Sequence, residues 1–213
     1  MPEILYKFVF RILPIENLVF DLRDGLFSKN KAPVNPQRSI IGNEEIIRER
    51  DNRIVTCYPK TVVNDYVPFY FSNRTPMLYN IITGMGVQKR NQEDIVYLCI
   101  PLKELMCNRF QWCFTDGNAA KSITAFYNRL DDLCRIDKKS INSNDFRMIN
   151  ADGDVDRIRK KHAEFLVRDH VPVDLIREIV VFNEKMKKEV EKMLKSLNLE
   201  EQIKVKVDID YYF

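Results

Sequence analysis

A carboxylate that could act on a substrate stands at Glu164 of this 213-residue chain. It lies in the short alternating segment 163–169, directly after a basic run. In a strand, alternation places Glu164 and Leu166 on one face and Phe165 and Val167 on the other. If that face meets water, Glu164 is an edge carboxylate. If it lines a cleft, partial desolvation suits the side chain to act as a general base or an electrostatic stabiliser.

Two arginines are candidate functional partners. Arg50 lies among Glu49, Asp51 and Arg53, where an exposed ion-pair cluster of little energetic weight is the simplest interpretation. Arg74 has no charged neighbour in the sequence and lies between aromatic residues and prolines. It therefore needs a partner, which would be either a backbone carbonyl or a bound anion such as a diphosphate.

Five aromatic rings and two prolines crowd the segment "DYVPFYFSNRTPMLYNI", residues 65–81, around that arginine. The prolines argue against one continuous central strand. The rings are core residues by default, but an aromatic platform that stacks a flat ligand or an unpaired base would use the same side chains. They are Tyr66, Phe69, Tyr70, Phe71 and Tyr79.

Basic residues gather in three runs, at residues 48–53, 88–90 and 157–162. Each run by itself is more typical of a solvated face than of a binding patch. The net charge of +3 neither requires nor excludes a nucleic-acid partner, because the distribution of charge matters more than its sum.

The elements that must position these residues can be traced along the chain. Alternation predicts a strand over residues 6–13, which Pro14 ends while opening a helix that stops at Gly25. Asn43 is a candidate N-cap for a second, short helix. Another strand is predicted over residues 94–102.

The second half of the chain mixes both types of element. Residues 111–120 contain a strand and a turn at Asp116–Gly117, and the spacing predicts a helix over residues 121–136. Further expectations are a strand within residues 174–183, an amphipathic helix over 184–197 and an alternating strand over 203–213. Strands and helices do not alternate strictly, so a single α+β or mixed-sandwich domain over residues 1–213 fits better than a doubly wound parallel sheet.

The composition argues against several classes of protein. The sequence has no apolar run of membrane-spanning length and its start lacks the features of a signal peptide, so we expect no membrane and a cytoplasmic location. Five cysteines without a CxxC pair favour free thiols, and two histidines argue against a metal centre. Neither GxGxxG nor a P-loop occurs, so any nucleotide binds without those phosphate cradles.

Several segments together resemble the DarT family, bacterial toxins that ADP-ribosylate nucleic acid. Residues 65–81 resemble the family signature "DYVPFYF.PRSPMLY.I", and "RILPIENL" at 11–18 is similar to "RITHIDNL". "PQRSI" at 36–40 resembles a "KQRSI" loop, and "IIRERDNRIV" resembles the segment that carries the family's catalytic arginine. "KKHAEFLVRDHVPVDLIREIVVFNE" is similar to the segment that carries the catalytic glutamate. The resemblance covers nearly the whole chain.

This resemblance implies an ADP-ribosyltransferase fold, with two small packed sheets, flanking helices and NAD as co-substrate in the cleft between them, and no metal. Glu164 matches the catalytic glutamate and Arg50 the catalytic arginine, with Arg48 and Arg53 as alternatives. The residues expected to contact NAD are Arg11, Asn17, Leu18, Tyr70, Met77 and Arg74. The polar segment 142–159 corresponds to the substrate-recognition loop, with residues 142–150 expected to govern base choice. The basic residues expected to meet nucleic-acid phosphates are Arg157, Arg159, Lys160 and Lys161.

The expected substrate is single-stranded DNA, with thymine as the base by family analogy. Single-stranded RNA by the same chemistry stays open, since the 2′-hydroxyl decides between them. Leu13–Pro14 replaces the family's Thr-His, which removes a hydroxyl and an imidazole from the NAD-facing turn and leaves a non-catalytic nucleic-acid or nucleotide-binding module as an alternative. The resemblance also implies a macrodomain-type antitoxin as partner.

Overall fold

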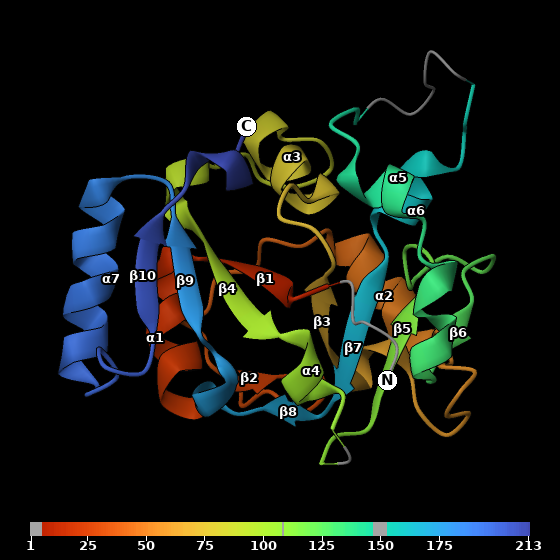
Figure 1. The fold of residues 1–213 in the computed structure, drawn as a ribbon, viewed down its shortest axis with the longest axis horizontal. Helices are drawn as coiled ribbons and strands as arrows, with labels where there is room; N and C mark the ends of the chain where they lie inside the picture. The colour runs from red at the N-terminus through yellow and green to blue at the C-terminus, as the bar shows by residue number, and fades with distance from the viewer. Residues whose placement is uncertain (1–5, 108, 147–152) are drawn as a thin grey trace.

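The computed structural model describes residues 6–107, 109–146 and 153–213. These residues form an eight-stranded sheet with the order β10-β9-β4-β1-β3-β7-β5-β6 and a two-stranded sheet, β2-β8 (Figure 1). The strands of the large sheet are β1 (Phe8–Pro14), β3 (Tyr66–Tyr70), β4 (Ile95–Pro101), β5 (Trp112–Thr115), β6 (Phe126–Tyr127), β7 (Glu164–Arg168), β9 (Glu178–Val181) and β10 (Lys204–Val207). The small sheet joins β2 (Leu26–Phe27) to β8 (His170–Val171).

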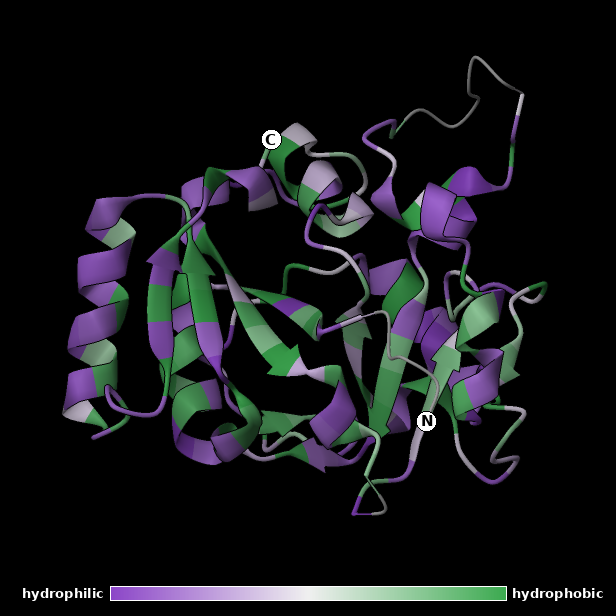
Figure 2. Ribbon diagram, in the orientation of Figure 1, coloured by the Kyte–Doolittle hydropathy of each residue, from purple (hydrophilic) through white to green (hydrophobic). Residues whose placement is uncertain are grey.

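Seven α-helices in the described residues surround these sheets: α1 (Ile15–Asp24), α2 (Glu44–Asn52), α3 (Pro76–Thr83), α4 (Leu102–Leu105), α5 (Lys138–Asn142), α6 (Arg157–Lys161) and α7 (Glu184–Ser196). The predicted N-cap of α2 is confirmed, because the Asn43 side chain accepts from the amides of Glu45 and Ile46. The predicted amphipathic α7 is confirmed too: its hydrophilic side faces away from the sheet while Met186, Val190 and Leu194 are buried (Figure 2).

The large sheet consists of two halves that barely join. β1 pairs with β4 over seven residues and β3 pairs with β7 over five, whereas β1 and β3 share one recorded pair among the described residues, Phe10 with Tyr70. The two small sheets expected from the resemblance thus correspond to two four-stranded halves of one sheet, β10-β9-β4-β1 and β3-β7-β5-β6. The point where they separate shapes the functional site.

The first helix begins and ends as the sequence predicts. Pro14 has an extended backbone at the end of β1 and starts α1, and Gly25 follows α1 with a φ of 80°. A Cβ on Gly25 would lie 2.7 Å from the carbonyl oxygen of Val171 in β8. The glycine is therefore required both by its dihedral angle and by the close approach of the small sheet.

The expectation that the two prolines prevent one continuous central strand over residues 65–81 is confirmed, because β3 ends at Tyr70 and Pro76 begins α3. Pro68 nevertheless lies within β3, between β1 and β7. The carbonyl oxygen of Pro68 accepts a hydrogen bond from Arg11 of β1 at 3.3 Å. In an extended strand the nitrogen and carbonyl of one residue point to the same side, so the proline nitrogen also faces the gap toward β1. No ladder hydrogen bond is lost there, since the two halves have already separated.

The helix predicted over residues 121–136, by contrast, is wrong. Its first part turns back and forms β6, which pairs with β5 through Phe114–Tyr127 and Thr115–Phe126. Its last part is a 3₁₀ segment, Leu130–Arg135. The turn at Asp116–Gly117 makes this hairpin possible, and burial of Phe126 outweighs the local helical spacing. The predicted C-terminal strand is shorter than expected, because β10 ends at Val207 and a 3₁₀ turn, Ile209–Tyr211, follows.

Candidate active site

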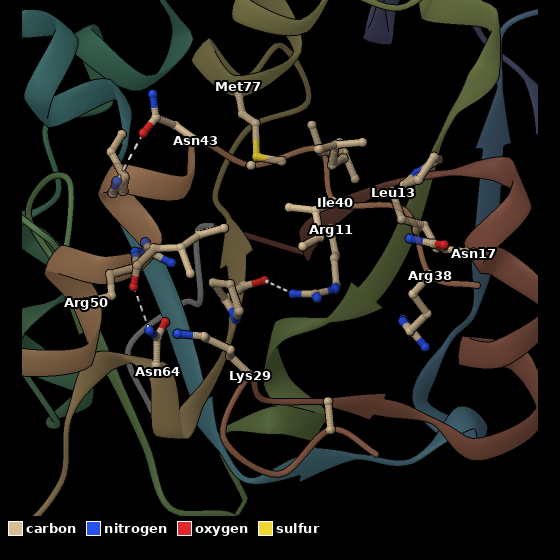
Figure 3. Close-up of a pocket in the computed structure, with 18 of the residues that line it drawn as sticks. Arg11, Leu13, Asn17, Lys29, Arg38, Ile40, Asn43, Arg50, Asn64 and Met77 are labelled. Carbon is tan, nitrogen blue, oxygen red and sulfur yellow. Dashed lines mark hydrogen bonds between the residues drawn. The ribbon is translucent and has the colours of Figure 1, made fainter. Parts of the chain in front are cut away.

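A cavity of about 480 Å³ opens where the two halves of the sheet separate. Its wall comes from β1, the start of α1, the loop before α2, α2 itself, β3, α3 and the first residue of β7 (Figure 3). A volume of this size lies within the range that accommodates small-molecule ligands.

Glu164 lies at the floor of this cavity. As the first residue of β7 it pairs with Tyr70 of β3, and its side chain is almost fully buried, at 3 % exposure for the residue. Both carboxylate oxygens accept hydrogen bonds from Nη2 of Arg50. The backbone amide of Ala119 donates to Oε1 at 3.3 Å. The edge-carboxylate alternative is therefore wrong, since Glu164 faces the cavity.

Arg50 reaches Glu164 from α2, across 114 residues of sequence. Burial alone would lower the pKa of Arg50, but the facing carboxylate of Glu164 raises it overall, so the guanidinium is charged. The alternatives lie elsewhere: Arg48 is exposed, and Arg53 donates to the carbonyl of Thr124 at 2.9 Å. Of the three candidates, Arg50 is the one that forms an ion pair with Glu164.

Tyr70 and Met77 line the cavity together, as the resemblance implies. The phenol of Tyr70 donates to Sδ of Met77 at 3.5 Å. Burial, and then the negative charge of Glu164, raise the pKa of Tyr70, so the hydroxyl stays protonated. The pair provides an uncharged, polarisable wall beside the Glu164–Arg50 ion pair.

The opposite wall carries positive charge. Arg11 is partly buried, and this burial lowers its pKa although the negative charge of Asp21 opposes that effect. Its Nε has no hydrogen-bond partner within the described residues. Arg38 forms an ion pair with Asp21 and lies 5.6 Å from the ring centre of Phe20. Two guanidinium groups, one with an unsatisfied buried donor, fit an anionic diphosphate such as that of NAD.

Asn17 binds the loop that contains Arg38 and Ser39 on this side of the cavity. Its amide nitrogen donates to the carbonyl of Ser39 at 2.7 Å, and its oxygen accepts from the amide of Ser39 at 2.9 Å. Asn17 also lines the cavity. Its two hydrogen bonds to Ser39 hold the loop that carries Arg38. Leu18, also expected to contact NAD, belongs instead to the hydrophobic core, with no exposed surface. Leu13 and Pro14, which replace the family's Thr-His, both line the cavity.

Arg74 lies away from the residues that line the cavity in the described structure. Its Nε donates to the carbonyl of Asp210 at 3.2 Å, and its guanidinium lies 5.9 Å from the ring centre of Phe213. The partner that the sequence required is therefore a backbone carbonyl, and the role of Arg74 is to bind the C-terminal segment.

The basic run before Glu164 differs from the expected free basic face, because its side chains pair with groups of the protein itself. Arg157 is buried and forms an ion pair with Asp145 at 2.9 Å. Lys161 is 2 % exposed and donates to the carbonyl of Ile141 at 2.7 Å. Arg159 pairs with Asp116 and Asp156, and Lys160 lies within 3.6–3.9 Å of Asp137, Asp154 and Asp156. Burial argues against a phosphate contact for Arg157 and Lys161, whereas Arg159 and Lys160 are ion-paired but partly exposed, so their contact with phosphates stays a prediction.

Part of the expected substrate-recognition loop, residues 147–152, lies outside the described residues. The expectation that residues 142–150 govern base choice therefore stays a prediction.

Sequence reasoning missed several residues of the cavity wall. His162 lines it, its Nδ1 lies 2.8 Å from the carbonyl of Ile158, and burial lowers its pKa, which leaves the ring neutral. Asn118 lies beside Glu164 in the wall. The position of His162, two residues before Glu164, was an available signal. Lys29, Arg38 and Asn64 are further wall residues, and of these Arg38 belongs to the recognised "PQRSI" motif.

Residues 6–107, 109–146 and 153–213 contain no cluster of three or more His, Cys, Asp or Glu side chains arranged to hold a metal ion. None of the helices in those ranges combines the length and apolar character needed to cross a membrane.

Comparison with known proteins places this fold and site among NAD-using ADP-ribosyltransferases. Residues 10–213 match the family model "ssDNA thymidine ADP-ribosyltransferase, DarT". A DNA ADP-ribosyl transferase of Thermus sp. (strain 2.9) is 32 % identical over 207 residues, which cover 96 % of this chain and 95 % of the relative. One from Escherichia coli O127:H6 is 31 % identical over 192 residues, covering 90 % and 87 %. The chain belongs to the DarT family.

The solved structures agree. Thermus sp. 2.9 DarT in complex with ADP-ribosylated ssDNA superimposes with a TM-score of 0.87, at 31 % identity, covering 97 % of this chain and 96 % of that one. The same relative in complex with NAD⁺ gives a TM-score of 0.81, at 30 % identity and 98 % coverage of both chains. The ADP-ribosyltransferase fold expected from the sequence is therefore confirmed.

Proposed function

We propose that this protein is an NAD-dependent ADP-ribosyltransferase that modifies thymine bases in single-stranded DNA. The observation that carries the proposal is the buried Arg50–Glu164 ion pair at the floor of a cavity whose opposite wall holds Arg11 and Arg38. The carboxylate suits the ribose that carries nicotinamide in NAD, and the cations suit its diphosphate. Both the family model and the relatives named above support this assignment.

The proposed role of each residue follows from the charge of its side chain. Bound NAD would supply the ADP-ribosyl group to the base nitrogen, and nicotinamide would be the leaving group as the bond between it and the ribose breaks. Arg11 and Arg38 bind the diphosphate, while Tyr70 and Met77 form the wall beside the reacting end. Glu164 directs its carboxylate at the positive charge that develops on the ribose, and a fixed charge there stabilises the transition state without reorganising.

Arg50 acts beside Glu164 on the acceptor. The attacking base nitrogen becomes a better nucleophile once it loses its proton. Glu164 accepts that proton, and Arg50 stabilises the negative charge that remains on the base. A base cannot reach this floor from inside a duplex, so the substrate is single-stranded or has the base turned out of the stack.

The chain's biological setting follows from this activity. We expect it to act as a toxin in the cytoplasm, where NAD and DNA are both available, and to be countered by a macrodomain-type antitoxin that removes the modification. Thermosipho africanus DarTG in complex with ADP-ribose has a TM-score of 0.75 at 22 % identity; this chain covers 51 % of it, and the likeness concerns the fold alone.

The test is to incubate the purified protein with NAD and matched oligonucleotides, single-stranded DNA or RNA, each lacking one of the bases, and to weigh the products. We expect an ADP-ribosyl adduct on DNA that contains thymine. Modification of RNA alone would move the assignment to the RNA alternative. No adduct on any oligonucleotide, together with NAD or nucleic-acid binding, would favour the non-catalytic binding module.

The matched variant is Glu164→Gln, which keeps the size of the buried side chain and removes its charge. We expect no detectable adduct, loss of toxicity on expression, and an unchanged fold by circular dichroism. Wild-type rates of modification by the variant would show that Glu164 is not the catalytic carboxylate.

A further inference from the structure

The hairpin between β5 and β6 touches Glu164 at its backbone as well as its carboxylate. The ladder between β5 and β7 runs from Trp112–Val167 to Phe114–Phe165. One residue further, the amide of Glu164 donates to the Thr115 hydroxyl at 3.0 Å. The buried Thr115 hydroxyl donates in turn to the carbonyl of Gly117 at 2.7 Å. One hydroxyl therefore joins the start of β7 to the turn.

The same turn delivers a donor to the carboxylate. The amide of Ala119 donates to Oε1 of Glu164 at 3.3 Å, while Arg50 binds both oxygens. The carboxylate thus has one donor from the turn and another from α2. The orientation of Glu164 depends on where this turn, residues 115–119, is held.

Arg159 holds the turn from the other side. Its carbonyl accepts from the amide of Asn118 at 3.0 Å, and its Nη1 donates to Asp116 at 3.1 Å and to Thr124 at 3.2 Å. A Cβ on Gly117 would lie 2.3 Å from Nη1 of Arg159 and 2.9 Å from its carbonyl oxygen. Gly117 therefore lets Arg159 lie directly against the turn.

We propose that Thr115 and Arg159 are positioning residues for Glu164, so that this arginine serves catalysis through the turn rather than by contacting DNA. The inference rests on the proposed transferase activity and names residues that this activity requires. Neither side chain needs to touch NAD or the base. A displacement of about 1 Å in a catalytic group can cost on the order of 100-fold in rate, so a loosened turn should be visible in kcat.

The first test compares Thr115→Val, which keeps the shape and loses the hydroxyl, with Thr115→Ser, which keeps the hydroxyl. Ser122→Ala, a hydroxyl loss at an exposed position of the same hairpin, is the control. We expect Thr115→Val to lower kcat by roughly 10- to 100-fold with KM for NAD and oligonucleotide within about 2-fold. Thr115→Ser should restore most of the rate. Equal rates in the valine and serine variants would overturn the proposal for Thr115.

The second test separates positioning from DNA binding in Arg159→Ala. A positioning role predicts a lower kcat and an unchanged salt dependence of oligonucleotide binding. A phosphate contact predicts the opposite, with a raised oligonucleotide KM and a salt slope smaller by about 1. That second outcome would overturn the proposal for Arg159.

Amide hydrogen exchange tests the same inference without the reaction. We expect the amides of Ala119 and Glu164 to exchange faster in both Thr115→Val and Arg159→Ala than in the wild type, with core strand β4 unchanged. If the wild type did not modify DNA, the proposed function would be wrong. The exchange rates would still test whether Thr115 and Arg159 hold the turn and Glu164 in position. Unchanged exchange at both amides would overturn this inference. Gly117→Ala gives an independent disturbance of the turn if Thr115→Val does not fold.

Discussion

At the scale of single residues, the proposed catalytic pair, Arg50 and Glu164, is an ion pair with little exposure to solvent. Glu164 is closed off from water, and Arg50 has the same oxygens as its main partner. Removing one member of such a pair leaves a buried charge without compensation, which is costly. Mutation of Arg50 should therefore lower the free energy of unfolding as well as the rate of the reaction, so the rate is compared on variants whose folded state is verified by circular dichroism.

Arg50→Ala is expected to lower kcat by about 100-fold while changing the NAD dissociation constant by less than about 3-fold. The reason is that the charge which Arg50 stabilises exists mainly during transfer. Calorimetry with NAD and rates on thymine-containing oligonucleotides measure the two effects separately. Arg48→Ala, at an exposed position of the same helix, is the control. A large loss of NAD affinity with little loss of rate would move Arg50 from catalysis to cofactor binding.

Lys161 makes stability depend on pH. Burial lowers the pKa of this lysine from 10.5 to about 8. Between those values the unfolded chain holds a proton that the folded protein has released, so the free energy of unfolding contributed by this group rises with pH. The cost of burying the charge is fully present below about pH 8 and disappears as the pH approaches 10.5.

We expect the wild type to gain stability relative to Lys161→Met between about pH 8 and about pH 10, as measured by urea unfolding at each pH. The other groups that titrate in this range are present in both proteins, so their contributions cancel in the difference between the two free energies of unfolding. Parallel pH profiles for the two proteins would mean that Lys161 titrates normally in the folded state.

At the scale of elements, α2 carries Arg50 although none of its residues, all within the described ranges, is fully buried. Polar contacts hold the helix instead. Asn43 caps its start, and the Asn64 amide donates to the carbonyl of Ile47 at 2.8 Å and to Asp51 at 2.7 Å (Figure 3). The orientation of Arg50 toward Glu164 therefore depends on a few hydrogen bonds rather than on a hydrophobic face.

Asn64→Ala should release α2 from the rest of the domain. We expect faster amide exchange across Glu44–Asn52 and a transfer rate lowered by about 10-fold, with a global loss of about 1–2 kcal/mol. Asn30→Ala, which removes an exposed amide contact to Asp65, should change neither quantity appreciably. Normal exchange across α2 in Asn64→Ala would show that other contacts hold the helix.

At the scale of the whole molecule, the separation of the two halves of the large sheet creates the site. The C-terminal segment stabilises the half that contains β4 and β9. The buried Tyr212 hydroxyl donates to the carbonyls of Ile95 at 2.9 Å and Val180 at 3.2 Å, which joins β4 to β9. Tyr212, Ile95 and Val180 are not among the described residues that line the cavity. The contribution of Tyr212 should be to stability alone.

Tyr212→Phe is expected to lower the free energy of unfolding by about 1 kcal/mol, because a buried hydroxyl contact to two carbonyls is lost while the ring still packs. Urea unfolding measures the loss. The NAD dissociation constant and kcat should match the wild type. A fall in kcat without a fall in stability would contradict this division and would link the C-terminal segment to the site.

Local patterns in the sequence predicted many of the helices and strands and identified Glu164 as the candidate carboxylate. Pro14, Asn43 and Gly25 act through backbone dihedral angles and side-chain capping within a few residues, so their effects are readable without a fold. Glu164 was found from the alternation of a short strand and from its motif. The family motifs added Arg50, which spacing by itself placed in an exposed cluster.

The tertiary structure alone decided which charges meet. It brought Arg50 to Glu164 across 114 residues, bound Arg74 to a carbonyl of the C-terminal segment and paired Arg159 of α6 with Asp116. It also admitted Pro68 into a central strand, because the two halves of the sheet separate there. The physical reason is common to these cases. Burial and ion pairing depend on which surfaces face each other after folding, and local periodicity carries no information about contacts between distant segments.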